Sequence, residues 1–136
     1  MADVAYVALG SNLGDRRAHL AAARAALAAT PGVELLAESA VEETPPIGPA
    51  GQPPYLNQMV ALRTTLSPEA LLDRLQEVER SAGRERAERW GPRTLDLDVV
   101  LIEGRSVATE RLTVPHPELP RRDFWQRELA ELRTAP

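Results

Sequence analysis

The chain has 136 residues, of which 43% are hydrophobic, and a formal net charge of −4. This length suits one domain with a sizeable core, and the acidic balance argues against a general nucleic-acid binder. The lack of cysteine excludes a disulfide framework, a thiolate nucleophile and a thiolate metal site. No apolar run reaches the roughly 20 residues that span a bilayer, and no secretory signal is evident. We therefore expect one cytoplasmic domain over residues 1–136, a monomer that binds neither membrane nor nucleic acid.

Strand-like and helix-like segments alternate along the chain. β-Branched and aromatic residues predict strands, and apolar residues recurring every three or four positions predict helices. In chain order, the predicted elements are a strand at 3–10, a helix at 16–29, strands at 33–43 and 55–66, a helix at 68–82, a strand at 94–102 and a weakly helical tail from 123. The order β-α-β-β-α-β predicts an α+β protein with the ferredoxin-like arrangement, in which both helices cover one face of an antiparallel sheet.

Residue types mark the helix starts and the loops. Asp15 is a candidate N-cap for the first helix, and Ser67 followed by Pro68 begins the second. The segment 44–54 holds five prolines and two glycines, which predicts a long but stiff loop. We interpret GSNLGD, residues 10–15, as a strand-to-helix turn whose glycines supply special φ values. It lacks the lysine and hydroxyl residues that end a phosphate-binding P-loop.

Two aspartates, Asp96 and Asp98, interrupt the otherwise apolar run TLDLDVVLI. On a strand, residues two apart share a face and lie about 6.5–7 Å apart, so both carboxylates point the same way. Leu95, Leu97 and Val99 then point to the other face. Like charges this close favour a cation between them, and oxygen-only ligands suit Mg²⁺, singly or as a pair of ions. A solvent-facing strand with two hydrated aspartates gives the same pattern, so the pair alone leaves both interpretations open.

All 16 basic residues are arginine, so no lysine is present to clamp a phosphate or form a Schiff base. Arginine is densest just ahead of the two aspartates, at positions 80, 84, 86, 89 and 93. Guanidinium groups bind phosphate oxygens in pairs, and carboxylate-held Mg²⁺ beneath an arginine-bearing loop is typical of phosphoryl transfer. Pairing of these arginines with Glu79, Glu85 and Glu88 on a solvated surface is the alternative.

Two further groups of polar and aromatic residues stand next to predicted strands. His116 lies between two prolines, close in sequence to Arg111 and Arg122, where it can donate a hydrogen bond to a phosphate oxygen. Tyr55 and Asn57 share a strand face after the proline-rich loop, and an aromatic ring beside an amide suits a flat heterocycle. A structural histidine and ordinary packing of Tyr55 and Asn57 are the alternatives.

Taken together, these segments resemble the 6-hydroxymethyl-7,8-dihydropterin pyrophosphokinase family, whose members move pyrophosphate from ATP to a pterin hydroxymethyl group. The resemblance rests on VALGSNLGD, TPPIGPAGQPPYLNQMVAL, LLDRLQEVERSAGRERAERWGPRTLDLDVVL and RLTVPHPEL, which follow in the family's order between residues 4 and 124. It implies an α-β-α sandwich with ATP as co-substrate. It also implies two Mg²⁺ ions on Asp96 and Asp98, and attack of the pterin hydroxyl on the β-phosphorus with release of AMP.

The resemblance implies roles for individual residues as well. The expected catalytic residues are Arg84, Arg93, Asp96 and Asp98. The expected ATP ligands are Gln76, Glu79, Arg84, Arg86, Arg93, Arg111, Thr113, His116 and Arg122. The expected pterin ligands are Thr44, Pro45, Ile47, Tyr55, Asn57, Trp90 and Phe124. The arginine loop is one residue shorter than in some relatives, so Arg84 and Arg86 are alternatives for one phosphate contact.

Two other classes of protein fit the bare motifs. A different Mg²⁺-dependent phosphotransferase or phosphohydrolase would use the same aspartates on another acceptor. A non-catalytic ligand-binding or regulatory domain would keep the ferredoxin-like fold with vestigial aspartates. Formation of AMP only in the presence of the pterin separates the pyrophosphokinase from both.

Overall fold

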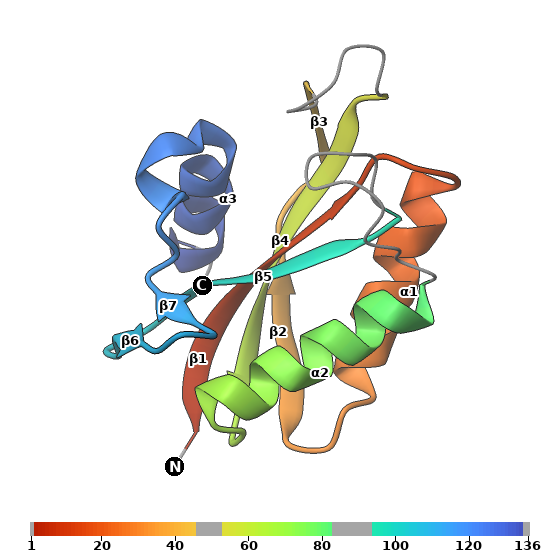
Figure 1. Ribbon diagram of the computed structural model, residues 1–136. Helices are drawn as coiled ribbons and strands as arrows, with labels where there is room; N and C mark the ends of the chain where they lie inside the picture. The colour runs from red at the N-terminus through yellow and green to blue at the C-terminus, as the bar shows by residue number, and fades with distance from the viewer. Residues whose placement is uncertain (1, 46–52, 83–93, 135–136) are drawn as a thin grey trace.

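The computed structural model describes residues 2–45, 53–82 and 94–134 (Figure 1). Its elements, in chain order, are β1 Asp3–Ser11, α1 Arg16–Ala28, β2 Val33–Glu38, β3 Glu42–Thr44, β4 Tyr55–Thr64, α2 Pro68–Ser81, β5 Asp96–Ile102, β6 Val107–Ala108, β7 Thr113–Val114, the 3₁₀ turn η1 Leu119–Arg121 and α3 Asp123–Thr134. This content confirms the α+β class. Within the described residues, no helix is long and apolar enough to cross a membrane.

The main sheet is antiparallel throughout, with the strand order β2-β4-β1-β5 and the short β3 paired to β4. The central strands β1 and β4 are buried along nearly their whole length. In Figure 1, α1 and α2 lie on one side of this sheet and α3 lies on the other. Each side of the sheet has its own apolar cluster, so the protein has two cores separated by the sheet.

Both predicted N-caps are confirmed. The Asp15 carboxylate accepts a hydrogen bond from the Ala18 amide at 3.1 Å, and the Ser67 hydroxyl accepts one from the Ala70 amide at 3.2 Å. Pro68 occupies the first turn of α2, where its missing N–H costs nothing. Each cap satisfies a donor that the first helical turn leaves without a partner, and such a cap stabilises a helix by about 1 kcal/mol.

The segment predicted as one strand at 33–43 is divided into β2 and β3. Between them, the Ser39 amide donates to the Met59 carbonyl and the Ser39 hydroxyl accepts from the Met59 amide, both at 2.9 Å. The next amide, of Ala40, donates to the Glu131 carboxylate on α3 at 3.0 Å. The chain therefore leaves the β2 ladder at Ser39, and β3 pairs separately with the start of β4.

The weakly helical tail forms α3 and supplies the second core. Trp125, Leu129 and Leu132 are buried against the sheet, together with Tyr6 and Met59. These α3 positions follow a spacing of three and four residues, which places them on one helical face. The same face also carries an acidic residue.

That acidic residue is Glu128, whose side chain is only 2% exposed. Burial, reinforced by the carboxylate of Glu42 on β3, raises the pKa of Glu128 to about 9. Arg127 opposes the shift but is itself bonded to Glu42 at 2.6 Å. Glu128 therefore keeps its proton at neutral pH, because a buried neutral acid costs far less than a buried charge.

Replacing Glu128 with glutamine should make stability less sensitive to pH. The unfolded carboxyl titrates near its ordinary value of 4.5, so between pH 5 and pH 8 the unfolded chain has lost a proton that the folded chain keeps. The wild-type free energy of unfolding then falls as pH rises, by up to about 1.4 kcal/mol per pH unit from this group. Urea unfolding should therefore show that the free energy of unfolding of Glu128→Gln, relative to that of the wild type, increases from pH 5 to pH 8.

The matched control is Glu110→Gln, which changes an exposed carboxyl between β6 and β7. Because Glu110 is exposed, this substitution should change the free energy of unfolding little at any pH in this range. A Glu128→Gln difference that is equally constant from pH 5 to pH 8 would contradict a protonated Glu128 in the folded protein.

Candidate functional site

Strand register brings the predicted site residues to one end of the sheet. Gly10 on β1 lies opposite Asn57 on β4 and opposite Asp96 on β5. Two residues along, Ala8 lies opposite Asp98. Residues paired across antiparallel strands share a face, so both aspartates lie on the same face of the sheet as the Asn57 amide. This is the face covered farther along by α3.

The predicted placement of the apolar residues of this segment, on the face opposite the aspartates, is confirmed as well. Leu95, Leu97 and Val99 are buried in the core under α1 and α2. The Asp98 side chain remains 41% exposed. The acidic positions of β5 therefore face an accessible surface, while the apolar positions fix the strand from behind.

Gly10 allows the neighbouring side chains to approach the middle of this face. A Cβ at this position would lie 3.3 Å from Asn57 Oδ1 and 3.4 Å from Tyr55 Cδ1. The φ angle of Gly10 is not positive, whereas Gly14 has a φ of +72°. Our interpretation of the GSNLGD glycines as suppliers of special φ values is therefore correct for Gly14 and wrong for Gly10, where the close approach of neighbouring side chains favours glycine instead.

Three predicted pterin ligands meet beside Gly10. The Asn57 Nδ2 donates to Thr44 Oγ1 at 2.5 Å, which fixes the orientation of the amide. Tyr55 pairs in register with Thr44, and its hydroxyl lies 3.5 Å from Asp96 Oδ2. These contacts place an aromatic ring, an oriented amide and a carboxylate next to one another.

The other two described pterin candidates lie at the border of this group. Pro45 follows Thr44 directly and is exposed. Phe124, in the first turn of α3, packs against the core under α3, with its ring 6.2 Å from that of Trp125. Both positions adjoin the sheet face that carries the aspartates.

His116 is held beside Asp98 by three contacts. Its amide donates to the Val100 carbonyl at 2.8 Å, its Nδ1 accepts from the Glu118 amide at 3.0 Å, and its ring meets Trp125 edge-on at 4.9 Å. The Nδ1 contact leaves the hydrogen of the neutral ring on Nε2, which lies 3.8 Å from Asp98 Oδ1. Burial lowers the pKa of His116 despite the attraction of Asp98, so the ring is a neutral donor at pH 7.

Trp125 is a supporting residue that sequence reasoning missed. Besides His116, it carries the guanidinium of Arg122, whose Cζ lies 4.4 Å above the indole ring. The buried Nε of Arg122 has no hydrogen-bond partner in the described part of the chain. The signal available was the position of Trp125 next to Phe124 in a chain with few aromatic residues, but its orientation depends on how α3 docks.

The remaining described ATP candidates lie on α2, on β7 and in the turn between β6 and β7. Glu79 is buried and accepts a hydrogen bond from the Leu97 amide at 2.8 Å, between the two aspartates in sequence. Gln76 is half-buried on α2, and Thr113 is exposed on β7. Arg111 is exposed and donates to Asp73 on α2, a contact that raises the pKa of the guanidinium. Five predicted site residues lie outside the described residues: Ile47, Arg84, Arg86, Trp90 and Arg93.

The chemistry of Asp96 and Asp98 fits a hard cation such as Mg²⁺. Among the described residues, no three His, Cys, Asp or Glu side chains gather closely enough to enclose a metal. Two carboxylates on one accessible strand face instead suit an ion that completes its shell with water and phosphate oxygens, as Mg²⁺ commonly does.

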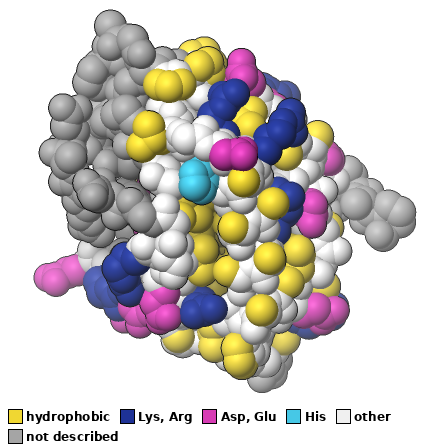
Figure 2. All heavy atoms as spheres, turned by 90° about the vertical axis from the view of Figure 1, so that its right-hand side faces the viewer, with side chains coloured by type: hydrophobic (Ala, Val, Ile, Leu, Met, Phe, Trp, Pro, Cys, Tyr) yellow, Lys and Arg dark blue, Asp and Glu magenta, His cyan; other side chains and the backbone are white. Residues whose placement is uncertain are grey.

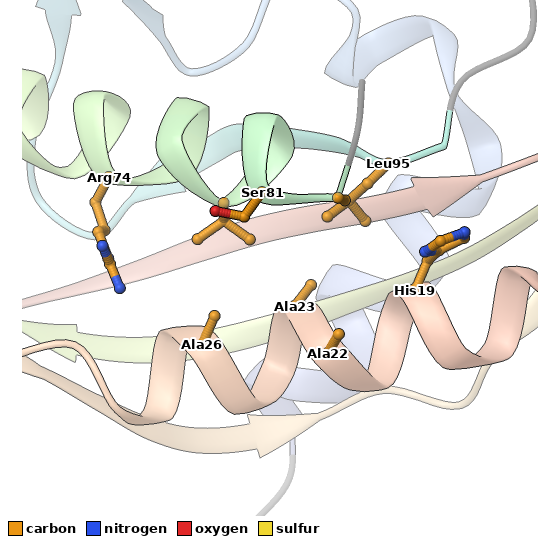
Figure 3. A pocket seen from close by; sticks show the side chains of 9 residues that line it. His19, Ala22, Ala23, Ala26, Arg74, Ser81 and Leu95 are labelled. Atoms are coloured by element: carbon orange, nitrogen blue, oxygen red, sulfur yellow. The ribbon is translucent and has the colours of Figure 1, made fainter. Parts of the chain in front are cut away.

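A separate crevice of about 320 Å³ lies between α1 and α2, on the opposite side of the sheet. Alanines of α1 form one wall, with His19 and Arg74 at its two ends (Figure 3). On the same side of the molecule, Figure 2 shows acidic and basic side chains interspersed among apolar ones. The crevice contains none of the predicted ATP, metal or pterin ligands, so it is not the candidate site.

Comparison with known proteins identifies the family. A sequence model of the 7,8-dihydro-6-hydroxymethylpterin-pyrophosphokinase family matches residues 6–134. The chain belongs to this pyrophosphokinase family. It is 47% identical over 128 residues to the 2-amino-4-hydroxy-6-hydroxymethyldihydropteridine pyrophosphokinase of Methylorubrum extorquens, covering 94% of this chain and 81% of the relative.

Two more members of the pyrophosphokinase family carry the same name. The relative from Bacillus subtilis is 43% identical over 132 residues, and the match covers 97% of this chain and 79% of the relative. The relative from Pseudomonas aeruginosa is 46% identical over 127 residues, and the match covers 93% of this chain and 78% of the relative. The similarity therefore extends over the β1–α3 framework and the strands that carry the candidate site.

Replacing Gly10 with alanine should strain the centre of the site. The new methyl group would press on Asn57, whose amide is fixed by Thr44 and has little freedom to move away. We expect the free energy of unfolding to fall by about 1 kcal/mol or more, measured by urea denaturation.

The control for this substitution is Gly104→Asn. A Cβ at Gly104 meets nothing within 4 Å, and asparagine tolerates its positive φ. Stability of the Gly10→Ala protein equal to that of the wild type, with a similar result for the control, would contradict the close approach at Gly10.

Proposed function

We propose that the protein transfers pyrophosphate from ATP to the hydroxymethyl group of 6-hydroxymethyl-7,8-dihydropterin, giving the pterin diphosphate and AMP, in folate biosynthesis. One observation carries the proposal. In this member of the pyrophosphokinase family, Asp96 and Asp98 lie on the same face of the sheet as the hydrogen-bonded pair Thr44 and Asn57, and next to it. The two aspartates suit phosphates with their metal ions, and the adjoining group around Asn57 suits a flat heterocycle.

The acceptor side would hold the pterin through Asn57, Tyr55 and Phe124. Because Asn57 Nδ2 already bonds Thr44, the amide orientation is set, and Asn57 Oδ1 is directed toward the space above Gly10. An oriented amide can distinguish donors from acceptors on the edge of a heterocycle, while aromatic rings contact its faces. Pro45, Ile47 and Trp90 complete the proposed pterin ligands.

The donor side would hold the triphosphate over β5. Asp96 and Asp98 are the proposed ligands of two Mg²⁺ ions, which when bound neutralise phosphate charge and help to align the reacting groups. His116 Nε2 can donate to a phosphate oxygen in its neutral state, and the guanidinium of Arg122, which lies over the Trp125 ring, is the second proposed donor. Both donors are held in place by Trp125, so little reorganisation accompanies phosphate binding.

The remaining proposed ATP ligands are Gln76, Glu79, Arg84, Arg86, Arg93, Arg111 and Thr113. For Glu79, the bond to the Leu97 amide supports an additional part in holding β5 in place. In the proposed reaction, the pterin hydroxyl oxygen forms a bond to the β-phosphorus of ATP as the bond from that phosphorus to the α-phosphate oxygen breaks. Arg84 and Arg93 are the proposed arginines that stabilise the charge on the transferring group.

We further propose the ferredoxin-like arrangement for the fold, supported by the strand order β2-β4-β1-β5 and by the placement of α1 and α2 on one face. We likewise propose that residues 1–136 form a single domain that acts as a monomer. Use of ATP and of a folate precursor fits action in the cytoplasm.

The proposed reaction is tested by its nucleotide product. The protein is incubated with ATP, Mg²⁺ and 6-hydroxymethyl-7,8-dihydropterin, and nucleotides are separated by chromatography. We expect AMP in amounts equal to the pterin diphosphate, and none when the pterin or Mg²⁺ is left out. ADP or free phosphate as the product would show a different phosphotransferase, and the absence of turnover with intact pterin binding would show a binding protein.

Removing either negative charge from β5 should stop this reaction. Asp96→Asn and Asp98→Asn keep the shape of the side chain but lose the anionic ligand, so we expect turnover to fall by a factor of about 10² to 10³ or more. Circular dichroism should show an unchanged fold. The control is Asp3→Asn, at the far end of β1, where the aspartate pairs with Arg105 at 2.6 Å. Wild-type turnover in either β5 variant would contradict the metal-ligand assignment.

A further inference from the structure

The chain enters β4 through two prolines whose carbonyls are held by residues of another segment. Asn12 Nδ2 donates to the Pro53 carbonyl at 3.2 Å, and an Arg16 guanidinium nitrogen donates to the Pro54 carbonyl at 2.8 Å. Proline has no N–H, so these two residues cannot donate backbone hydrogen bonds to a neighbouring strand. Their position before Tyr55 therefore depends on one donor from the turn after β1 and one from the first residue of α1.

Arg16 also binds the neighbouring strand. The same guanidinium nitrogen that bonds Pro54 lies 3.3 Å from Glu43 Oε2 on β3. Glu43 immediately precedes Thr44, and Pro54 immediately precedes Tyr55, which is the partner of Thr44 in the β3–β4 register. One side chain thus joins the two backbone segments that present Thr44 and Tyr55.

The helix itself gives no reason for arginine at this position. Arg16 is the first residue of α1, whose first turn has no acidic residue. A cation at a helix N-terminus is unfavourable, because the unpaired amides there carry a partial positive charge. Its side chain is nevertheless only 28% exposed. The contacts to Glu43 and Pro54 account for its placement.

The short strand β3 depends on such contacts. It has three residues and pairs only with β4 within the described sheet. Consecutive strand residues point to opposite faces, so the bond from Arg127 to Glu42 holds β3 from the α3 side while Arg16 holds Glu43 from the α1 side. Loss of the Arg16 side chain would therefore remove a contact to β3 and a contact to the segment that precedes β4 at the same time.

We propose that Arg16 is a positioning residue for the pterin acceptor, acting through the backbone on either side of Thr44 and Tyr55. This inference rests on the proposed function. Arg16 does not touch substrate; it keeps the binding-competent arrangement populated. If that arrangement becomes a minor one, the apparent affinity for pterin falls in proportion, while ATP binding over β5 is unaffected.

The test compares Arg16→Ala with the wild type in steady-state kinetics and in direct pterin titration by calorimetry. We expect the KM and the dissociation constant for the pterin to rise about tenfold, which is about 1.4 kcal/mol. The KM for ATP and the kcat should stay within about twofold, since the interaction lost affects ground state and transition state alike. Arg16→Lys, which keeps a charged donor, should recover part of the pterin affinity.

Two controls separate this role from general stabilisation. Arg63→Ala removes another arginine–glutamate ion pair, with Glu34 at 3.0 Å, which is more exposed and lies at the far end of β4, and it should leave pterin affinity unchanged. Glu43→Gln removes the ion pair of Arg16 but leaves its bond to Pro54, so its effect should be smaller than that of Arg16→Ala.

The possible failures are distinguishable. A wild-type protein that makes no AMP with the pterin would overturn the proposed function itself. An active wild type with unchanged pterin affinity in Arg16→Ala would overturn only the inference. Parallel losses of pterin affinity, ATP affinity and thermal stability in Arg16→Ala would also overturn it, because they would show a purely structural role.

Discussion

The packing of three strands around Gly10 is the constraint on which the candidate site depends. β1 lies between β4 and β5, and its residue at the level of Asn57 and Asp96 has no side chain. The space above Gly10 is therefore shared by an amide, an aromatic ring and a carboxylate, which approach from both flanking strands. A side chain at this position would require Asn57 or Tyr55 to shift, since a Cβ there would already lie 3.3 Å from the Asn57 amide oxygen.

The site is a continuation of the core beneath α3. Along β4 the buried Met59 is followed on the same face by Asn57, and along β5 the buried Val100 is followed by Asp98 and then Asp96. Apolar residues stand where α3 covers the sheet, and polar ones stand beyond it. Trp125 marks the border: one side belongs to the core, and the other supports His116 and Arg122. Burial thus fixes the backbone from which the polar groups project.

Local sequence patterns predicted the features that depend on neighbours in the chain. The alternation in TLDLDVV placed Asp96 and Asp98 on one face because a strand has a period of two, and the caps of α1 and α2 followed from residue type. The family resemblance then supplied the proposed ligands. Features set by contacts between distant segments were not predicted from the residues. The division at Ser39 needs Met59 and α3, and the close packing at Gly10 needs the strand register.

On this proposal, the pterin binds on the α3 side of the sheet, between Thr44 and Asp98, and not in the alanine-lined crevice between α1 and α2. Nuclear magnetic resonance of the isotopically labelled protein, titrated with the pterin in the presence of a non-hydrolysable ATP analogue and Mg²⁺, tests this most directly. We expect the largest amide shifts at Gly10, Thr44 and Asn57. Shifts centred on Ala22 and Ala26 in the crevice would contradict it.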